Sequence, residues 1–436
     1  MHSTCVRKCL PRLYMRVLIL AFFMMLFTPA TAMAVADYQY PYADAYKATV
    51  FGTPPEMVYP IEKPVTPKLR SIRIEGRQVP KIFSYSREMF YSTALQKDEA
   101  PLIFIVAGTG AEHDSSKMVF LTKAFYQAGY HVVALSSPTH MNFVVSISEH
   151  GVPGYVPYDV EDLYRVMLWI KEDIEKERKV SDYFITGYSL GAMHTAFLTQ
   201  RDSVRGDFNF RKALMINPPV SLYHSVARLD SWLTPENLGE ESVHDEIEHF
   251  IDLFSDYYET ADVTDLDDNF LYELVTHVKL EDKDLRALIA VDFRVSSSSM
   301  IFASDVCLQA GYVVPPDDYP LGSGRPLLPY AEEAFEISFD EYMHEYLLPY
   351  LQHVQPGMDR YTMMQQCSLY DIRTYLKETD KIVVIGNRND VILNEHDLKF
   401  IDSVFGNRAK LYPSGGHCGN IMYTPFVETM LEMVKP

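Results

Sequence analysis

Apolar runs that alternate with amphipathic segments occupy most of this chain. Continuous apolar runs are typical of strands that are covered on both faces of a sheet. Such runs occur at residues 102–106, 131–135, 183–186, 212–216, 381–386 and 409–412. The segments that follow or separate them have the apolar period of an α-helix, at residues 117–130, 160–179, 192–198, 394–405 and 425–434. Strands that alternate with helices predict an α/β fold with a doubly wound, mostly parallel sheet.

Two stretches before this alternation have a different pattern. Residues 35–68 are rich in Tyr and Pro, and Pro disfavours both helix interiors and central strands. We therefore expect an extended arm on the domain surface there, rather than a helix. Residues 71–74 and 81–85 then alternate in polarity around Gly76, which predicts an antiparallel hairpin at the start of the sheet.

The alternation stops between residues 221 and 380, where the sequence has helical tendency. Residues 332–350 predict one amphipathic helix with aromatic side chains on one side. Residues 230–284 contain 18 Asp or Glu and only two Lys. Such a composition is typical of solvated helix faces; the alternative is that these residues create a negative electrostatic field that favours cationic substrates. We predict a mainly helical insertion that forms a lid over an α/β core, the core being residues 69–220 and 381–436.

The first residues have the pattern of a secretory signal peptide. Four basic residues precede an apolar segment at 17–27, and small residues then offer cleavage sites near Ala34. We expect residues 1–34 to be removed and the protein to be periplasmic or secreted, without stable insertion in a membrane. The alternative is an uncleaved anchor, because residues 17–36 are uncharged and just long enough to span a bilayer.

Composition narrows the class of protein further. The chain has 436 residues, 47% of them hydrophobic, and a net charge of −20, so a nucleic-acid partner is not expected. No Cys or His pair has the spacing of a zinc site, and we expect no metal. Beyond the signal segment the cysteines are Cys307, Cys367 and Cys418. In an oxidising compartment Cys307 and Cys367 could form a disulfide, and two free thiols are the alternative.

One short motif carries chemistry. Gly187-x-Ser189-x-Gly191 lies between the apolar run at 183–186 and the helical segment at 192–198. In that context the pattern predicts a sharp strand-to-helix turn that holds the serine Oγ clear of the backbone. Ser189 is therefore a candidate nucleophile.

A serine hydroxyl needs a positioned base, which is itself oriented by a carboxylate. Loops at the carboxyl ends of parallel strands lie together, so the partners of Ser189 should follow later strands. Asp390 follows the run at 381–386, and His417 follows the run at 409–412 in a glycine-rich loop. We interpret His194, on the helix after the motif, as a core or surface residue.

With the order Ser, Asp, His, the chain resembles the α/β-hydrolase superfamily over roughly residues 70–436. The resemblance implies Ser189 as nucleophile, His417 as general base and then acid, and Asp390 as the residue that fixes the imidazole. It also implies an oxyanion hole from the backbone N–H groups of Leu190 and Thr109. Many members have His-Gly where this chain has Ala107-Gly108, a departure that leaves the backbone donor intact.

These observations predict a serine hydrolase that cleaves small or lipid-like carboxylic esters without a cofactor. We expect the substrate pocket to include Gly110, His140 and Tyr188. Two alternatives remain open: a serine peptidase or aminopeptidase with the same triad, and a binding protein that keeps the fold without turnover.

Overall fold

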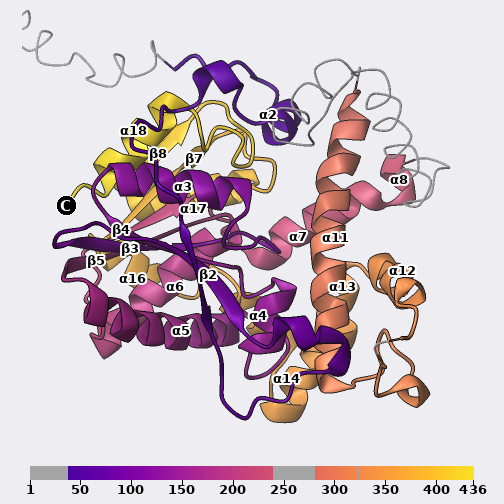
Figure 1. The fold of residues 1–436 in the computed structure, drawn as a ribbon. Coiled ribbons are helices and arrows are strands. Elements are labelled where there is room, and N and C mark those ends of the chain that lie inside the picture. Colours follow the sequence, from indigo (N-terminus) through magenta and orange to yellow (C-terminus); the bar gives the residue numbers. More distant parts are fainter. Residues whose placement is uncertain (1–37, 239–279, 323) are drawn as a thin grey trace, which may run out of the picture. The chain divides into compact units, whose positions relative to one another are not determined.

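Eight strands form one mixed sheet in the computed structural model, which describes residues 38–238, 280–322 and 324–436 (Figure 1). The strand order is β1-β2-β4-β3-β5-β6-β7-β8. Strand β2 runs antiparallel to both neighbours, and the strands from β4 onward along this order are parallel. The strands are β1 (Lys68–Ile72), β2 (Met89–Ala94), β3 (Ala100–Val106), β4 (His131–Leu135), β5 (Val180–Tyr188), β6 (Lys212–Ile216), β7 (Ile382–Asn387) and β8 (Ala409–Tyr412).

Helices cover both faces of this sheet within the unit formed by residues 42–436. Helices α3 (Ser116–Gln127) and α18 (Thr424–Met433) lie on one face, and α5 (Val156–Glu177) and α6 (Leu190–Arg205) lie on the other (Figure 1). Every residue of β4 is therefore buried, as the continuous apolar run predicts. The doubly wound, mostly parallel α/β fold is confirmed.

The register of the parallel strands brings their carboxyl ends to one edge. Tyr188 at the end of β5 pairs with Ile216 at the end of β6, and Ile216 pairs with Ile385 near the end of β7. Residues that follow these strands consequently lie close together. This edge positions the candidate site.

Between β6 and β7 the described residues form helices and no named strand, which agrees with the predicted helical insertion. The longest of these helices is α11 (Asp282–Leu308), seen in orange beside α7 and α12 in Figure 1. The others are α7 (Leu222–Asp230), α8 (Pro235–Leu238), α12 (Leu328–Glu336), α13 (Phe339–Glu341), α14 (Leu348–Val354), α15 (Arg360–Gln366) and α16 (Arg373–Glu378). Most of the acidic stretch and the whole predicted signal segment lie outside the described residues.

Helix α11 is the one described helix that is long and apolar enough to cross a membrane. Its apolar window is 56% buried inside the fold, and a core helix satisfies the same criteria of length and composition. Its N-terminus is fixed by a capping box between Glu281 and Asp284. The burial of α11 is therefore typical of a helix that packs within the domain.

The prediction of a single helix at residues 332–350 is wrong. Helix α12 ends at Glu336, and Ser338 begins a new helix: its Oγ accepts from the Glu341 N–H at 3.1 Å, while a Glu341 carboxylate oxygen accepts from the Ser338 N–H at 2.8 Å. This capping box interrupts a segment whose apolar period continues across it. The chain then passes through a π-helical turn, Tyr342–Leu347, into α14.

Two predictions for the N-terminal part are also wrong. The expected extended arm contains helix α2 (Ala45–Phe51), whose first turn is capped by the Asp44 side chain. The partner of β1 is β2, and the segment predicted as its strand is a 3-10 helix, Lys81–Ser86. Pro80, with φ near −51°, precedes the first residue of this 3-10 helix, and the Phe83 side chain within the helix is buried. The alternation of polar and apolar residues does not distinguish such a helix from a strand.

All three cysteines beyond the signal segment are free thiols, so the possible disulfide between Cys307 and Cys367 is not formed. The Cys367 thiol donates to the Gly154 carbonyl oxygen at 3.7 Å. Burial raises the pKa of Cys307 to about 11 and that of Cys367 to about 12. Both groups are therefore protonated and unreactive at neutral pH.

A buried carboxylate fixes the connection between α6 and β6. Asp202 accepts hydrogen bonds from the Phe208 N–H at 2.9 Å, the Phe210 N–H at 3.0 Å and the Tyr164 hydroxyl at 3.0 Å. Because Asp202 is only 2% exposed, its loss would leave two backbone donors without an acceptor. We therefore regard this carboxylate as the main polar support of that connection.

Replacing Asp202 by Ala is expected to lower the free energy of unfolding by about 2–4 kcal/mol, because buried donors lose their acceptor. Asp207→Ala is the matched control, since Asp207 also accepts from the Tyr164 hydroxyl, at 3.0 Å, but is partly exposed. The control should lose less than about 1 kcal/mol. Denaturant titration measures both, and equal losses would contradict the role given to Asp202.

Candidate active site

Ser189 lies on a strained turn between β5 and α6. Its backbone has φ 53° and ψ −126°, a conformation that L-residues seldom adopt. The turn is so tight that a Cβ on Gly191 would lie 2.1 Å from the Val106 carbonyl oxygen, and one on Gly187 would lie 2.4 Å from the Gly191 carbonyl oxygen. Only glycine fits at either position, which explains the motif.

The structure brings Ser189, His417 and Asp390 into one series of hydrogen bonds. His417 Nδ1 lies 3.0 Å from both carboxylate oxygens of Asp390, and His417 Nε2 lies 2.9 Å from Ser189 Oγ. A carboxylate accepts, so Nδ1 carries the proton and Nε2 accepts from the serine hydroxyl. The imidazole is thereby set to take the Ser189 proton.

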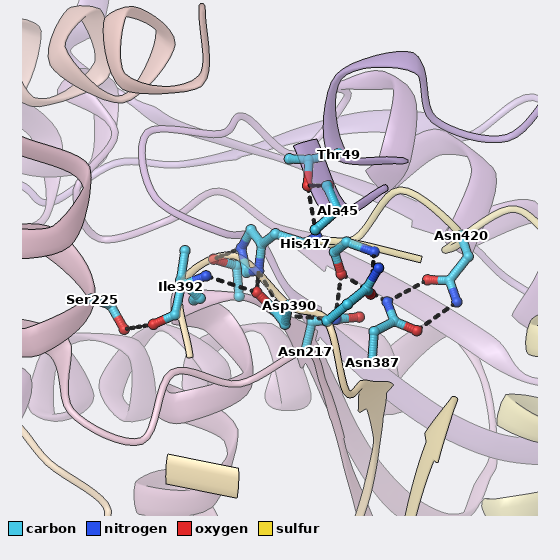
Figure 2. Close-up of polar contacts among 12 residues, drawn as sticks. Ala45, Thr49, Asn217, Ser225, Asn387, Asp390, Ile392, His417 and Asn420 are labelled. Atoms are coloured by element: carbon cyan, nitrogen blue, oxygen red, sulfur yellow. Dashed lines mark hydrogen bonds and ion pairs between the residues drawn. The ribbon is translucent and has the colours of Figure 1, made fainter. Parts of the chain in front are cut away.

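Asp390 is buried and has further donors around it (Figure 2). One oxygen accepts from Asn217 Nδ2 at 2.8 Å, and the other accepts from the Ile392 N–H at 3.1 Å. Both carboxylate oxygens are therefore held by donors other than the imidazole, which fixes the orientation of the side chain. Asn217 directly follows β6, at the same edge of the sheet as Ser189.

A pair of asparagines holds the loop that carries His417. Asn387 and Asn420 exchange side-chain hydrogen bonds at 2.8 and 2.7 Å. Asn387 Nδ2 also donates to the Gly416 carbonyl oxygen at 2.8 Å, next to His417 (Figure 2). The end of β7 is thus tied to the loop after β8, and both sides of the Asp390–His417 contact are fixed.

Helix α2 packs directly on the same loop. Thr49 Oγ1 accepts from the His417 N–H at 2.9 Å and donates to the Ala45 carbonyl oxygen at 2.7 Å (Figure 2). A Cβ on Gly419 would lie 1.8 Å from the Ala48 carbonyl oxygen, so the loop approaches α2 as closely as backbone allows. The segment expected to be an arm is instead a support for His417.

The two predicted oxyanion donors lie beside Ser189. Leu190 is the first residue of α6, and Thr109 follows β3; both line the cavity that contains Ser189. Neither backbone N–H donates a hydrogen bond within the described part of the chain. Among the described residues, both donors therefore remain free to bind an oxygen atom of a molecule in this cavity.

A cavity of about 520 Å³ opens beside these groups. Helices α7 and α11 of the insertion supply much of its wall, so the site is shared by core and insertion. Its apolar lining includes Val50, Leu222, Val226, Leu229, Leu288, Ile289, Phe293 and Ile392. Burial raises the pKa of Tyr188, which also lines the cavity, to about 12, so that phenol is neutral there.

Two residues expected in the pocket do not line this cavity. Gly110 is covered by α11: a Cβ there would lie 2.5 Å from the Cβ of Ser296. His140 precedes helix α4 (Met141–Ser146), and its N–H donates to the Ser137 carbonyl oxygen at 2.9 Å.

A group of ligand-type atoms occurs at Glu112, His113 and Asp114, where one atom from each residue lies within 4.8 Å of the others. His113 is buried, its Nδ1 shares a hydrogen bond with Ser92 Oγ at 2.8 Å, and its Nε2 lies 3.9 Å from a Glu112 oxygen. Burial lowers the pKa of His113, so its imidazole is held neutral beside the two carboxylates.

Sequence reasoning missed Asn217, Asn387 and Thr49. The two asparagines had a signal, because each stands at the carboxyl end of a predicted strand, where polar residues gather around a site. Thr49 had none: only the fold brings α2 against a loop that lies 368 positions away in sequence.

Replacing Thr49 by Val is expected to slow the reaction of Ser189 with a fluorophosphonate about fivefold or more. The change keeps the shape but removes the acceptor of the His417 N–H, and a hydrogen bond of about 1 kcal/mol corresponds to that factor. Thr49→Ser keeps the hydroxyl and should react at nearly the wild-type rate. Equal rates for the Val and Ser variants would show that the bond does not position His417.

Comparisons with known proteins give a resemblance in structure and none in sequence. No protein-family model matches the chain, and no curated protein matches it. Among solved structures it is similar to brefeldin A esterase, a bacterial homologue of human hormone-sensitive lipase, at 13% identity and a TM-score of 0.42, covering 91% of this chain and 83% of that one.

Two further similar structures are of enzymes with different activities. An esterase of Pyrococcus furiosus has 12% identity and a TM-score of 0.40, covering 87% of this chain and 97% of that one. A proline iminopeptidase of Mycobacterium smegmatis has 12% identity and a TM-score of 0.40, covering 84% and 98%. Likenesses at this level carry no argument about substrate. The chain's own strand order, the turn at Ser189 and the order Ser, Asp, His identify its fold as that of the α/β-hydrolases.

Proposed function

We propose that this protein is a serine hydrolase that cleaves carboxylic esters through an acyl-enzyme. The observation that carries the proposal is the unbroken series Asp390–His417–Ser189, with hydrogen bonds of 2.9 to 3.0 Å. A serine that donates to an imidazole, itself held by a buried carboxylate, has the arrangement of an activated nucleophile. The N–H groups of Leu190 and Thr109, which have no acceptor among the described residues, support the second requirement, an oxyanion site.

The geometry supports the following sequence of steps. Ser189 Oγ attacks the carbonyl carbon of the ester while its proton passes to His417 Nε2. The carbonyl oxygen becomes negative and accepts from the N–H groups of Leu190 and Thr109. The tetrahedral intermediate expels the alcohol, which takes the proton from Nε2, and leaves an ester between Ser189 and the acyl group.

Water completes the cycle by the same groups. His417 Nε2 takes a proton from water as its oxygen attacks the acyl carbon, and Ser189 Oγ leaves with that proton. The products are a carboxylic acid and the free enzyme. Asp390 remains ionised throughout and stabilises the imidazolium in both halves of the reaction.

The apolar lining of the cavity supports an apolar acyl or aryl group as part of the substrate. Hydrolysis of an amide would use the same groups, so a peptidase remains the alternative. A binding protein without turnover is less well supported, because the three side chains lie within hydrogen-bonding reach of one another.

We also propose that the protein is exported, on the basic, apolar and small-residue segments at its start. Mass spectrometry of the protein from periplasm or culture medium is expected to find a chain that begins near Val35. An intact N-terminus in the membrane fraction would instead support the uncleaved anchor.

Replacing Ser189 by Ala is expected to abolish labelling by a fluorophosphonate and to lower kcat on p-nitrophenyl esters by about 10⁴-fold or more. Asp390→Asn should leave the fold intact and still cost about 10³–10⁴-fold, because the imidazole loses its orienting acceptor. Asp380→Asn is the control: Asp380 also lies near β7 but is exposed, and this variant should behave as wild type.

Turnover of aminoacyl anilides in preference to esters would favour the peptidase. A folded wild-type protein that neither reacts with the probe nor hydrolyses any substrate would overturn the proposal and favour the binding protein.

A further inference from the structure

One face of α11 borders the cavity. Ile289, Asp292, Phe293 and Ser296 are spaced i, i+3, i+4 and i+7, and all four line the cavity. Ser296 packs on the oxyanion loop at Gly110, where a Cβ would lie 2.5 Å from its own. Residues four apart are separated by about one helical turn, so Asp292 stands one turn from this contact, on the wall of the cavity that contains Ser189.

Asp292 is a carboxylate in a mostly apolar wall. Its side chain is accessible from the cavity, yet the surrounding protein raises its pKa by desolvation. Within the described residues it makes no hydrogen bond and no ion pair within 4.0 Å. Its charge is therefore open to whatever occupies the cavity, and an apolar occupant would displace the water around it without supplying a partner.

One cation lies in the same cavity without pairing with it. Lys117, in the first turn of α3, lines the cavity and lowers the pKa of Asp292 through its charge. No ion pair joins the two groups within 4.0 Å in the described chain. The Asp292 carboxylate on α11 and the Lys117 ammonium on α3 are therefore two separate, opposite charges on the cavity wall.

Several features favour a cation over an anion beside Asp292. The rings of Tyr188 and Phe293 line the same cavity, and aromatic faces attract cations. The chain carries a net charge of −20, which attracts cations and repels anions. An anionic ligand drawn to Lys117 would meet Asp292 in the same space.

We infer that Asp292 is a specificity-determining residue that binds a protonated amine carried by the substrate. The inference rests on the proposed hydrolase function for the reaction itself, and it names the class of ester: one whose acyl or alcohol part has an apolar stem ending in an ammonium group. The stem contacts the apolar lining, and the ammonium donates to the Asp292 carboxylate.

Two pairs of isosteric esters test this inference. In the first, p-nitrophenyl 6-aminohexanoate is compared with p-nitrophenyl heptanoate, which has a methyl group in place of the ammonium. In the second, 5-aminopentyl butyrate is compared with hexyl butyrate. For wild type, Asp292→Asn and Lys117→Gln, the measured quantity is the ratio of kcat/KM between the cationic and neutral members of each pair.

We expect Asp292→Asn to lower this ratio about tenfold or more in at least one pair, as the loss of a charge-assisted hydrogen bond implies, while the neutral ester changes less than about twofold. Lys117→Gln should raise the ratio or leave it unchanged, because a repelling charge is removed. A ratio that Asp292→Asn leaves unchanged in both pairs would overturn the inference. So would equal losses on both esters from both variants, which would indicate that Asp292 and Lys117 only support each other.

Binding without turnover separates this inference from the proposed function. Hexylammonium should raise the Tm of the wild-type protein more than that of Asp292→Asn, and hexanol should not distinguish them. If no ester is hydrolysed but hexylammonium binding depends on Asp292, the hydrolase proposal fails and the amine site stands. If esters are hydrolysed but hexylammonium binding and the ester ratios are both independent of Asp292, the amine site fails alone.

Discussion

The close approach of the start of α6 to the end of β3 is the constraint on which this structure depends. Gly191 lies against the Val106 carbonyl oxygen with no space for a Cβ, and the chain can reach that position from β5 only through a left-handed residue at Ser189. The strain is maintained because β5 is held in the sheet between β3 and β6 and α6 is packed on the sheet face. The same geometry that exposes the serine hydroxyl leaves the Leu190 N–H beside it without an acceptor among the described residues. One packing contact therefore prepares both the nucleophile and half of its oxyanion site.

The histidine needs a different kind of support because its loop has little regular structure. The loop has three residues at positive φ, Gly415, Gly416 and Cys418, and such a backbone is not self-stabilising. Its position is set from outside, by Asn387 through the Gly416 carbonyl and by Thr49 through the His417 N–H. These contacts join the first helix of the described unit to its last strands, so the geometry at His417 depends on the fold being complete.

The core of the fold and the central chemistry could be predicted from sequence because both depend on local patterns. Buried strands are continuous apolar runs, and a turn without space for side chains requires glycine at fixed positions.

The features that could not be predicted depend on long-range packing or on a local interaction that overrides the periodicity. The helix expected at 332–350 is divided by the Ser338–Glu341 capping box, which a periodicity count ignores. The role of α2 is invisible in a Pro- and Tyr-rich segment, because nothing in it indicates which loop it contacts. Pocket residues were the least predictable: Gly110 and His140 follow strands, as expected, but α11 covers the first and the second is the N-cap of α4.

The insertion contributes to substrate specificity in a way that the α/β core alone cannot. The core provides hydrogen-bond donors and acceptors around the reacting carbonyl, and these act on any ester or amide that reaches Ser189. Discrimination between substrates must come from groups that contact the parts that do not react. In this cavity those groups come largely from α7 and α11, and their lining is apolar apart from a few positions. An apolar wall discriminates weakly by size. A carboxylate that faces the cavity discriminates more strongly by charge, because an apolar group placed against it would remove its water and supply no partner. Asp292 is therefore the residue of the insertion from which the largest difference between competing substrates should arise.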